Sequence, residues 1–179
     1  MSREPGRDWA PARRIEAATR GRPGRREFLL LVETADLAVR LTVEKEQLQV
    51  LAMLVEQLLT GLPAVQVRNP ALDAEPIGPA GEGFPEQPDL EFRIARLSLG
   101  IDQERDLFVL MAYASEEEPE AEPAFGCLVN RGQIQRLSRQ ISALIAAGRP
   151  RCPLCQAPLD GAPHRCSGAN GHVGTAEQG

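Results

Sequence analysis

Two segments of the chain carry the same apolar pattern at a constant offset of 86 positions, as from Leu48 to Ile134, and this offset constrains the fold more than any other feature. Residues 44–60 and residues 131–147 each place apolar side chains at the spacing of one helix face. The matching pairs are Leu48 and Ile134, Leu51 and Leu137, Val55 and Ile141, Leu58 and Leu144, and Leu59 and Ile145. Each segment is predicted to be an amphipathic helix, and the glycine and proline that follow it predict its end.

Apolar runs of strand length come before each predicted helix. They cover residues 26–33 and 37–43 in the first half and residues 90–101, 106–114 and 125–129 in the second half. With residues 12–20 as a further strand, the halves become two β-β-β-α units at residues 12–61 and 90–148. The alternative is coincidence, because any two amphipathic helices can be aligned on their apolar faces. The pattern predicts an α+β fold in which an antiparallel sheet is covered by two helices.

Segments rich in proline, glycine and acidic residues divide the chain further. Residues 69–88 and 115–123 are predicted to be exposed loops, and the acidic loop at 69–88 is predicted to be flexible. We expect an α+β body at residues 1–148, a small zinc-knuckle-like appendage at 149–173 and a disordered tail at 174–179.

The charge of the chain is unevenly distributed. The net charge is −5, yet residues 1–26 carry eight arginines against three acids, and residues 131–179 carry six arginines against two acids. Residues 73–122 carry three arginines against fourteen acids. The acidic middle argues against a surface that binds nucleic acid throughout, whereas the basic ends leave a local contact with nucleic acid as an alternative.

Two features concern the cellular compartment. No apolar run is long enough for a transmembrane helix, and the charged N-terminus lacks the apolar region of a secretory signal. We therefore expect a cytoplasmic protein with no membrane partner, in which thiols stay reduced and clustered cysteines bind metal.

The window of residues 151–172 contains three of the four cysteines and both histidines. Cys152 and Cys155 form a Cys-x2-Cys pair, and Cys166 supplies a third thiolate for a tetrahedral zinc site. The fourth ligand is either His172, which follows Cys166 with a Cys-x5-His spacing, or His164, which precedes it with a His-x-Cys spacing. We favour His172, because the turn between Cys166 and His172 wraps a metal easily.

The chemistry of this window favours a structural zinc ion over a catalytic one. Three thiolates weaken the Lewis acidity of the metal, and Asp160 is the only acid in the window. The alternatives are a metal-free tail and a redox Cys-x2-Cys pair, although no thioredoxin-like pattern surrounds the pair. The fourth cysteine, Cys127, lies in an apolar strand and is expected to be a small buried side chain.

Several stretches of the chain resemble an uncharacterised actinobacterial family, a domain of unknown function. The resemblance runs through GRPGRREFLLLVE, VRLTVEKEQLQVLAMLVEQLL and LEFRIARLSLGID and ends with AAGRPRCPLCQAPLD and the HRC and NGH triplets. Family members look similar at this end, where they carry Cys-Pro-x-Cys and Gly-His-x-Cys-Pro patterns. This chain departs from the second pattern, since Ala162 and Pro163 precede His164 and Ser167 follows Cys166. The resemblance implies a shared fold and assigns no activity, substrate or catalytic residue.

The sequence therefore favours a non-enzymatic binding or adaptor module with a structural zinc site and an unknown protein partner. A nucleic-acid-associated zinc protein is the alternative, motivated by Arg149, Arg151 and Arg165 in and beside the zinc window. An enzyme with an unrecognised site is the third hypothesis, for which the sequence offers no catalytic residues.

Overall fold

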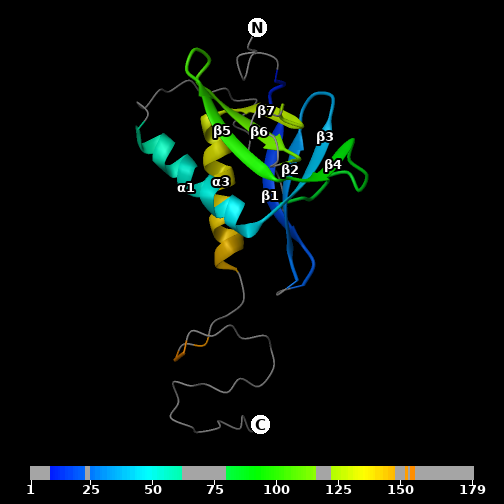
Figure 1. Ribbon diagram of the computed structural model, residues 1–179, viewed down its shortest axis with the longest axis vertical. Coiled ribbons are helices and arrows are strands. Elements are labelled where there is room, and N and C mark those ends of the chain that lie inside the picture. The colour runs from blue at the N-terminus through cyan, green and yellow to red at the C-terminus, as the bar shows by residue number, and fades with distance from the viewer. Residues whose placement is uncertain are drawn as a thin grey trace.

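The computed structural model describes residues 9–22, 25–61, 80–115, 122–147, 152 and 154–155. This part of the chain forms two helices and two sheets (Figure 1). The elements in chain order are β1 (Arg14–Arg20), β2 (Glu27–Glu33), β3 (Ala38–Val43), α1 (Lys45–Gly61), β4 (Leu90–Arg93), β5 (Arg96–Asp102), β6 (Leu107–Tyr113), β7 (Phe125–Val129) and α3 (Arg131–Ala146).

The predicted α+β class is confirmed, with the strands in two sheets instead of one. One sheet has the order β1-β2-β3-β4 and the other the order β5-β6-β7. All neighbouring strands are antiparallel except β3 and β4, which are parallel. Figure 1 shows α1 and α3 crossing each other on one side of the strands, and the two helices are in contact.

The internal repeat is confirmed in the secondary structure. Strands β1 to β3 followed by α1 form one β-β-β-α unit, and strands β5 to β7 followed by α3 form the other. The helices bury equivalent positions, which are Leu48 and Ile134, Leu51 and Leu137, Ala52 and Ser138, and Val55 and Ile141. The offset of 86 therefore reflects two helices that pack in the same way, and it is not a chance alignment of two amphipathic helices.

Each unit exchanges a short segment with the other. Strand β4 leads into the second unit, yet it pairs with β3 of the first. In the same way Pro11, just before β1, forms a parallel bridge to Leu128 in β7. The hydrogen bonds match, because Ile94 N donates to Thr42 O at 2.9 Å and Ala12 N donates to Leu128 O at 2.8 Å. This exchange ties the two sheets together at both junctions.

The predicted single strand at residues 90–101 is divided where the chain passes from one sheet to the other. Ile94 N bonds to β3, whereas the next residue, Ala95, donates its N–H to Tyr113 O in β6 at 2.8 Å. Arg13 makes the equivalent bond in the first unit, since its N–H donates to Glu33 O at 2.7 Å. The alternation of apolar residues changes phase here, from positions 90, 92 and 94 to positions 97, 99 and 101, and the prediction of a single strand overlooked this shift.

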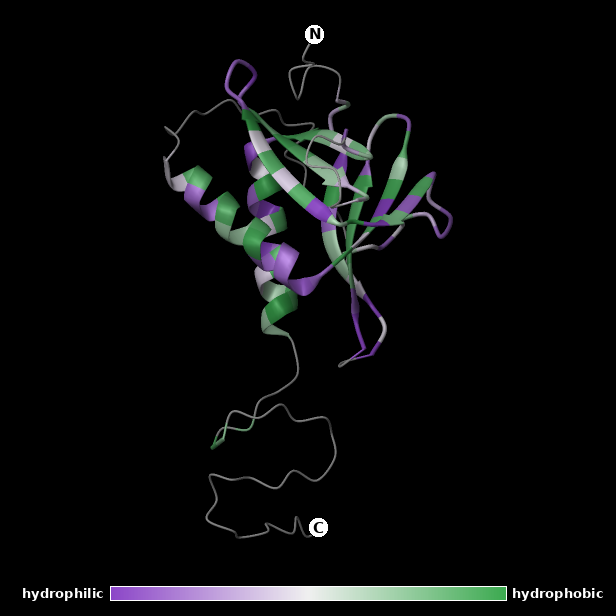
Figure 2. Ribbon diagram, in the orientation of Figure 1, coloured by the Kyte–Doolittle hydropathy of each residue, from purple (hydrophilic) through white to green (hydrophobic). Residues whose placement is uncertain are grey.

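One core is shared by both units. Phe108, Leu30, Leu41, Leu48, Leu110, Ile134, Leu137, Ile141, Val32, Val39 and Val55 are its largest fully buried apolar side chains. Figure 2 shows apolar residues along the strands and on the sides of the helices that face them. Because these residues come from both sheets and both helices, neither unit completes the core by itself.

The described end of the predicted acidic loop lies over the outer face of the four-stranded sheet. Residues 80–88 place Phe84 against a second, smaller apolar cluster that contains Leu29 and Leu31. The buried carboxylate of Glu16 accepts a hydrogen bond from Gly81 N at 2.8 Å. Residues 69–79 lie outside the described residues. No helix in the described part of the chain is long and apolar enough to cross a membrane.

Candidate functional site

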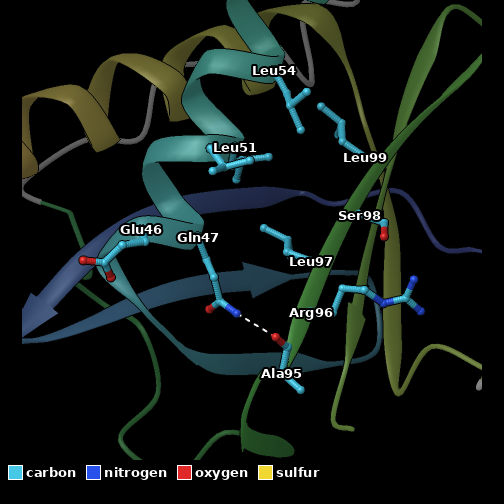
Figure 3. A pocket seen from close by; sticks show the side chains of 10 residues that line it. Glu46, Gln47, Leu51, Leu54, Ala95, Arg96, Leu97, Ser98 and Leu99 are labelled. Carbon is cyan, nitrogen blue, oxygen red and sulfur yellow. Dashed lines mark hydrogen bonds between the residues drawn. The ribbon is translucent and has the colours of Figure 1, made fainter. Parts of the chain in front are cut away.

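A cavity of about 530 Å³ lies between the N-terminal half of α1 and strand β5. Its lining consists of Glu46, Gln47, Val50, Leu51, Leu54, Ala95, Arg96, Leu97, Ser98 and Leu99. Figure 3 shows Leu97 and Leu99 pointing toward the helix, with Leu51 and Leu54 opposite them. The floor of this α1–β5 groove is therefore apolar.

The groove runs along an unpartnered sheet edge. In the part of the chain that the structure describes, β5 has β6 on one side and no strand on the other. The groove is closed at one end, where Gln47 Nε2 donates to Ala95 O at 2.8 Å (Figure 3). The same amide accepts a hydrogen bond from Glu44 N at 2.9 Å, which fixes the side chain at the start of α1. Beyond this end, the outward-facing peptide groups of β5 are available to pair with another strand.

The charged groups of the lining stand at its margin. Glu46 is exposed in the first turn of α1. Arg96 points away from the helix, and its guanidinium carbon lies 3.8 Å from the centroid of the Tyr113 ring (Figure 3). This stacking holds the positive charge on the far face of β5, so the space between helix and strand is left to leucine and valine side chains.

Helix α1 also carries a stripe of exposed apolar side chains beside the groove. Val50 is 54% exposed, Met53 63% and Leu54 39%. Their spacing of three and four residues places them on one helix face. A contiguous exposed apolar patch at a cavity is typical of a surface that binds another molecule. We refer to Val50, Met53 and Leu54 as the α1 stripe.

The second unit provides an internal comparison for this stripe. At the offset of 86, Arg136, Arg139 and Gln140 of α3 stand where Val50, Met53 and Leu54 stand in α1. The same helix position is thus polar in one unit and apolar in the other. Because both helices bury equivalent core positions, the difference is confined to the surface beside the strand.

The comparison extends to the edge of the sheet. At the edge strand β1 of the first unit, Ala17 N donates a hydrogen bond to Gln140 Oε1 of α3 at 3.2 Å, which satisfies an outward-facing N–H. Ala17 pairs with Leu30, and Leu99 pairs with Leu110 at the same place of the second unit. Leu54 stands at the position of Gln140, and leucine has no acceptor for an N–H. The α1–β5 groove is therefore the open counterpart of an interface that α3 and β1 close.

The predicted zinc ligands lie at the end of the described chain or beyond it. Cys152 is buried, at 6% exposure, and Cys155 is half-buried. Cys166, His164 and His172 lie outside the described residues, as do the arginines at 149, 151 and 165. Among the residues that are described, no three His, Cys, Asp or Glu side chains gather as metal ligands would. The zinc site stays a prediction.

Cys127 is a buried core residue, as its place in an apolar strand predicts. It is fully buried in β7 opposite Leu110. Burial raises the pKa of the Cys127 thiol from its ordinary value of 9.0 to about 12. The side chain is therefore a neutral thiol at physiological pH and not a nucleophile.

The α1–β5 groove was not found from the sequence. The signal was present as the contrast between Val50, Met53 and Leu54 and the polar residues 86 positions later. The alignment of the two halves rested mainly on the apolar helix face that packs into the core, whereas the groove is revealed by the helix positions beside that face.

The sequence profile of a family described as "Protein of unknown function (DUF3090)" matches residues 8–166. No curated protein and no solved structure matches the chain.

Proposed function

We propose that this chain, which belongs to the DUF3090 family of proteins of unknown function, is a non-enzymatic binding module that takes an extended segment of a protein partner into the α1–β5 groove. The observation that carries the proposal is the contrast between the two units. Leu54 is exposed where Gln140 closes the equivalent edge in the other unit. Exposure of an apolar side chain to water at an open sheet edge is unfavourable in free energy, and a second molecule that covers the side chain removes this cost.

The groove has the two parts that bind an extended peptide. The open edge of β5 offers backbone N–H and C=O groups, which give affinity when a further strand is added. The leucines of α1 and β5 offer an apolar floor for alternate side chains of that strand. Gln47 closes one end, so the bound segment lies along residues 97–102.

The lining favours a peptide over a nucleic acid. Phosphate recognition uses several cationic side chains, and unpaired bases are bound on aromatic rings. Arg96 is the one cation of the lining, and the floor is formed by leucines. These features match the apolar side chains of a protein segment.

The test is the affinity of short peptides with apolar residues at alternate positions, measured by fluorescence anisotropy. Leu54→Gln restores the residue type that closes the equivalent edge, so it is expected to preserve the fold and weaken binding by at least about tenfold. Leu37→Gln is the matched control, because Leu37 is 45% exposed in the turn between β2 and β3, away from the groove. The proposal is wrong if no peptide binds the monomeric wild type or if Leu54→Gln binds as tightly.

We also propose a structural zinc site at Cys152, Cys155 and Cys166 with His172 or His164 as the fourth ligand. Thiolate and imidazole donors in this number match the preferences of Zn²⁺. The buried position of Cys152 supports the proposal, because a buried thiol at the start of the Cys/His window is well placed for a closed site. Reduced thiols fit a protein that works in the cytoplasm.

A further inference from the structure

The residues of β5 form a pattern that is symmetric about Leu99. Leu97 lies two residues before Leu99, and Ile101 lies two residues after it. The small residues Ser98 and Gly100 are its direct neighbours, and Arg96 and Asp102 are the two ends of the strand. Read in the opposite direction, the strand again alternates apolar and small residues, with opposite charges at its two ends. A strand of this kind is complementary to an antiparallel copy of itself.

We propose that the occupant of the α1–β5 groove is β5 of a second copy of this chain, paired antiparallel about Leu99. The proposal rests on the proposed function, because it assigns a partner to that same groove. In this register Arg96 of each copy stands opposite Asp102 of the other, and Leu97 stands opposite Ile101. Two attractive cross-strand charge pairs and an apolar ladder then form across the interface.

The backbone geometry of β5 agrees with this register. Ala17 gives its N–H to a group outside its sheet, and Leu99 holds the same place in the second unit, paired with Leu110. The N–H and C=O groups of Leu99 therefore face the open edge, and alternation brings those of Leu97 and Ile101 to the same edge. A two-fold axis at Leu99 lets the two leucines exchange their backbone hydrogen bonds.

The charged ends of β5 are held in position within one chain. Arg96 is stacked on Tyr113, and Asp102 Oδ1 accepts a hydrogen bond from Arg105 N at 3.1 Å. Arg96 and Asp102 lie on the same face of the strand, since their positions differ by an even number of residues. They stand at opposite ends of β5, so their mutual attraction requires a second chain.

The α1 stripe supports the same arrangement. The side chains of Leu97 and Leu99 point to the α1 side of the sheet (Figure 3). A two-fold axis perpendicular to the joined sheet places both copies of α1 on that side. The exposed Val50, Met53 and Leu54 then face the partner, which gives an interface in which the same patch is used twice.

The test is the oligomeric state of the full chain, measured by analytical ultracentrifugation over a range of concentrations. The wild type is expected to form dimers. Arg96→Asp and Asp102→Arg each turn two attractive pairs into two repulsive ones, so each is expected to weaken the dimer by at least about tenfold. The double variant restores opposite charges across the interface and is expected to dimerise like the wild type. An equimolar mixture of the two single variants is expected to form heterodimers for the same reason.

Asp102→Asn provides a milder variant that keeps an acceptor for Arg105 N, and it is expected to weaken the dimer less than the charge reversal does. Circular dichroism checks that each variant is folded.

Single variants that dimerise as tightly as the wild type, or a double variant without recovery, would overturn the register. A monomeric wild type whose groove still binds short peptides in a Leu54-dependent way refutes the second copy and leaves the proposed function intact. A monomeric wild type that binds no peptide refutes both.

Discussion

Trp9 lies so close to Gly126 that a Cβ atom on the glycine would stand 2.7 Å from Cδ2 of the indole ring. The equivalent place in the other unit holds Arg40 and Glu91, whose side chains form an ion pair at 3.1 Å. Both contacts join the exchanged segment of one unit to the last strand of the other. The two junctions therefore share a backbone arrangement but use different side-chain contacts. One has an aromatic ring packed on a glycine, and the other has an ion pair.

Gly126→Ala is expected to displace the indole ring, because no Cβ atom fits at 2.7 Å from it. Trp9 is the only tryptophan of the chain, so its fluorescence emission should shift to longer wavelength as the ring becomes hydrated. The free energy of unfolding should fall by about 1–3 kcal/mol, as for other overpacked sites. Gly61→Ala is the control, since a Cβ there would meet no atom within 4 Å. An unchanged emission spectrum for Gly126→Ala would contradict the observed packing.

The junction between α3 and the N-terminal segment depends on Gln133, which is only 3% exposed. Its amide donates to Ala12 O at 2.8 Å and accepts from Asn130 N at 3.0 Å. Gln133→Ala leaves both backbone groups without these partners, so the free energy of unfolding should fall by about 1–3 kcal/mol in urea titration. Gln135→Ala, at an exposed position of the same helix, should change it by less than about 0.5 kcal/mol. Equal losses for the two variants would show that Gln133 does not hold the junction.

The fold could be predicted from the sequence as far as its periodicity reaches. The helical stripe that begins at Leu48 returns at Ile134, and both helices bury it, because a core face needs apolar residues at that spacing. Apart from the run at residues 90–101, the strands before each helix were predicted within about two residues of their bounds, the usual uncertainty of element ends. The class and the repeat therefore follow from local patterns.

The exchange between the units did not follow from those patterns. The run from Leu90 to Ile101 is predicted as one strand, although its alternation changes phase between Ile94 and Leu97, where hydrogen bonding passes to the other sheet. Which edges meet is decided by long-range packing, which periodicity does not encode. The groove was missed for a related reason. Taken alone, Val50 and Met53 are ordinary exposed apolar residues. Their significance appears only in comparison with the arginines at the matching positions of α3, the helix that closes the equivalent sheet edge.

Burial of Cys127 predicts a loss of stability at alkaline pH. The pKa of the thiol is 9.0 in an unfolded chain and about 12 in the folded protein, so the folded state binds the proton more tightly. The resulting stabilisation is complete below pH 9.0 and is lost as the pH rises toward 12, by about 1.4 kcal/mol for each pH unit. Urea unfolding at about pH 8 and about pH 10.5 should show the wild type losing roughly 2 kcal/mol more than Cys127→Ala. Equal losses would mean that Cys127 is accessible to solvent.

Zinc binding is expected at about one ion per chain, because one site of four ligands holds one metal. Cys152→Ser, Cys155→Ser and Cys166→Ser should each weaken binding sharply, since each removes a thiolate. Of His164→Ala and His172→Ala, only the variant that loses the fourth ligand should do the same. Cys127→Ala is the matched control and should keep its zinc, because Cys127 is buried in the core of the body.

Removal of the metal is expected to loosen residues 150–173 and leave the body folded. The shared core is built from residues upstream of the zinc window, and a short segment with few apolar side chains does not order itself without a staple. Chelation should therefore increase proteolysis and amide exchange within the window, while Trp9 emission stays constant because Trp9 packs on Gly126 in the body. Full-strength zinc binding by Cys155→Ser, or protection of the window after chelation, would show that these residues do not form the site.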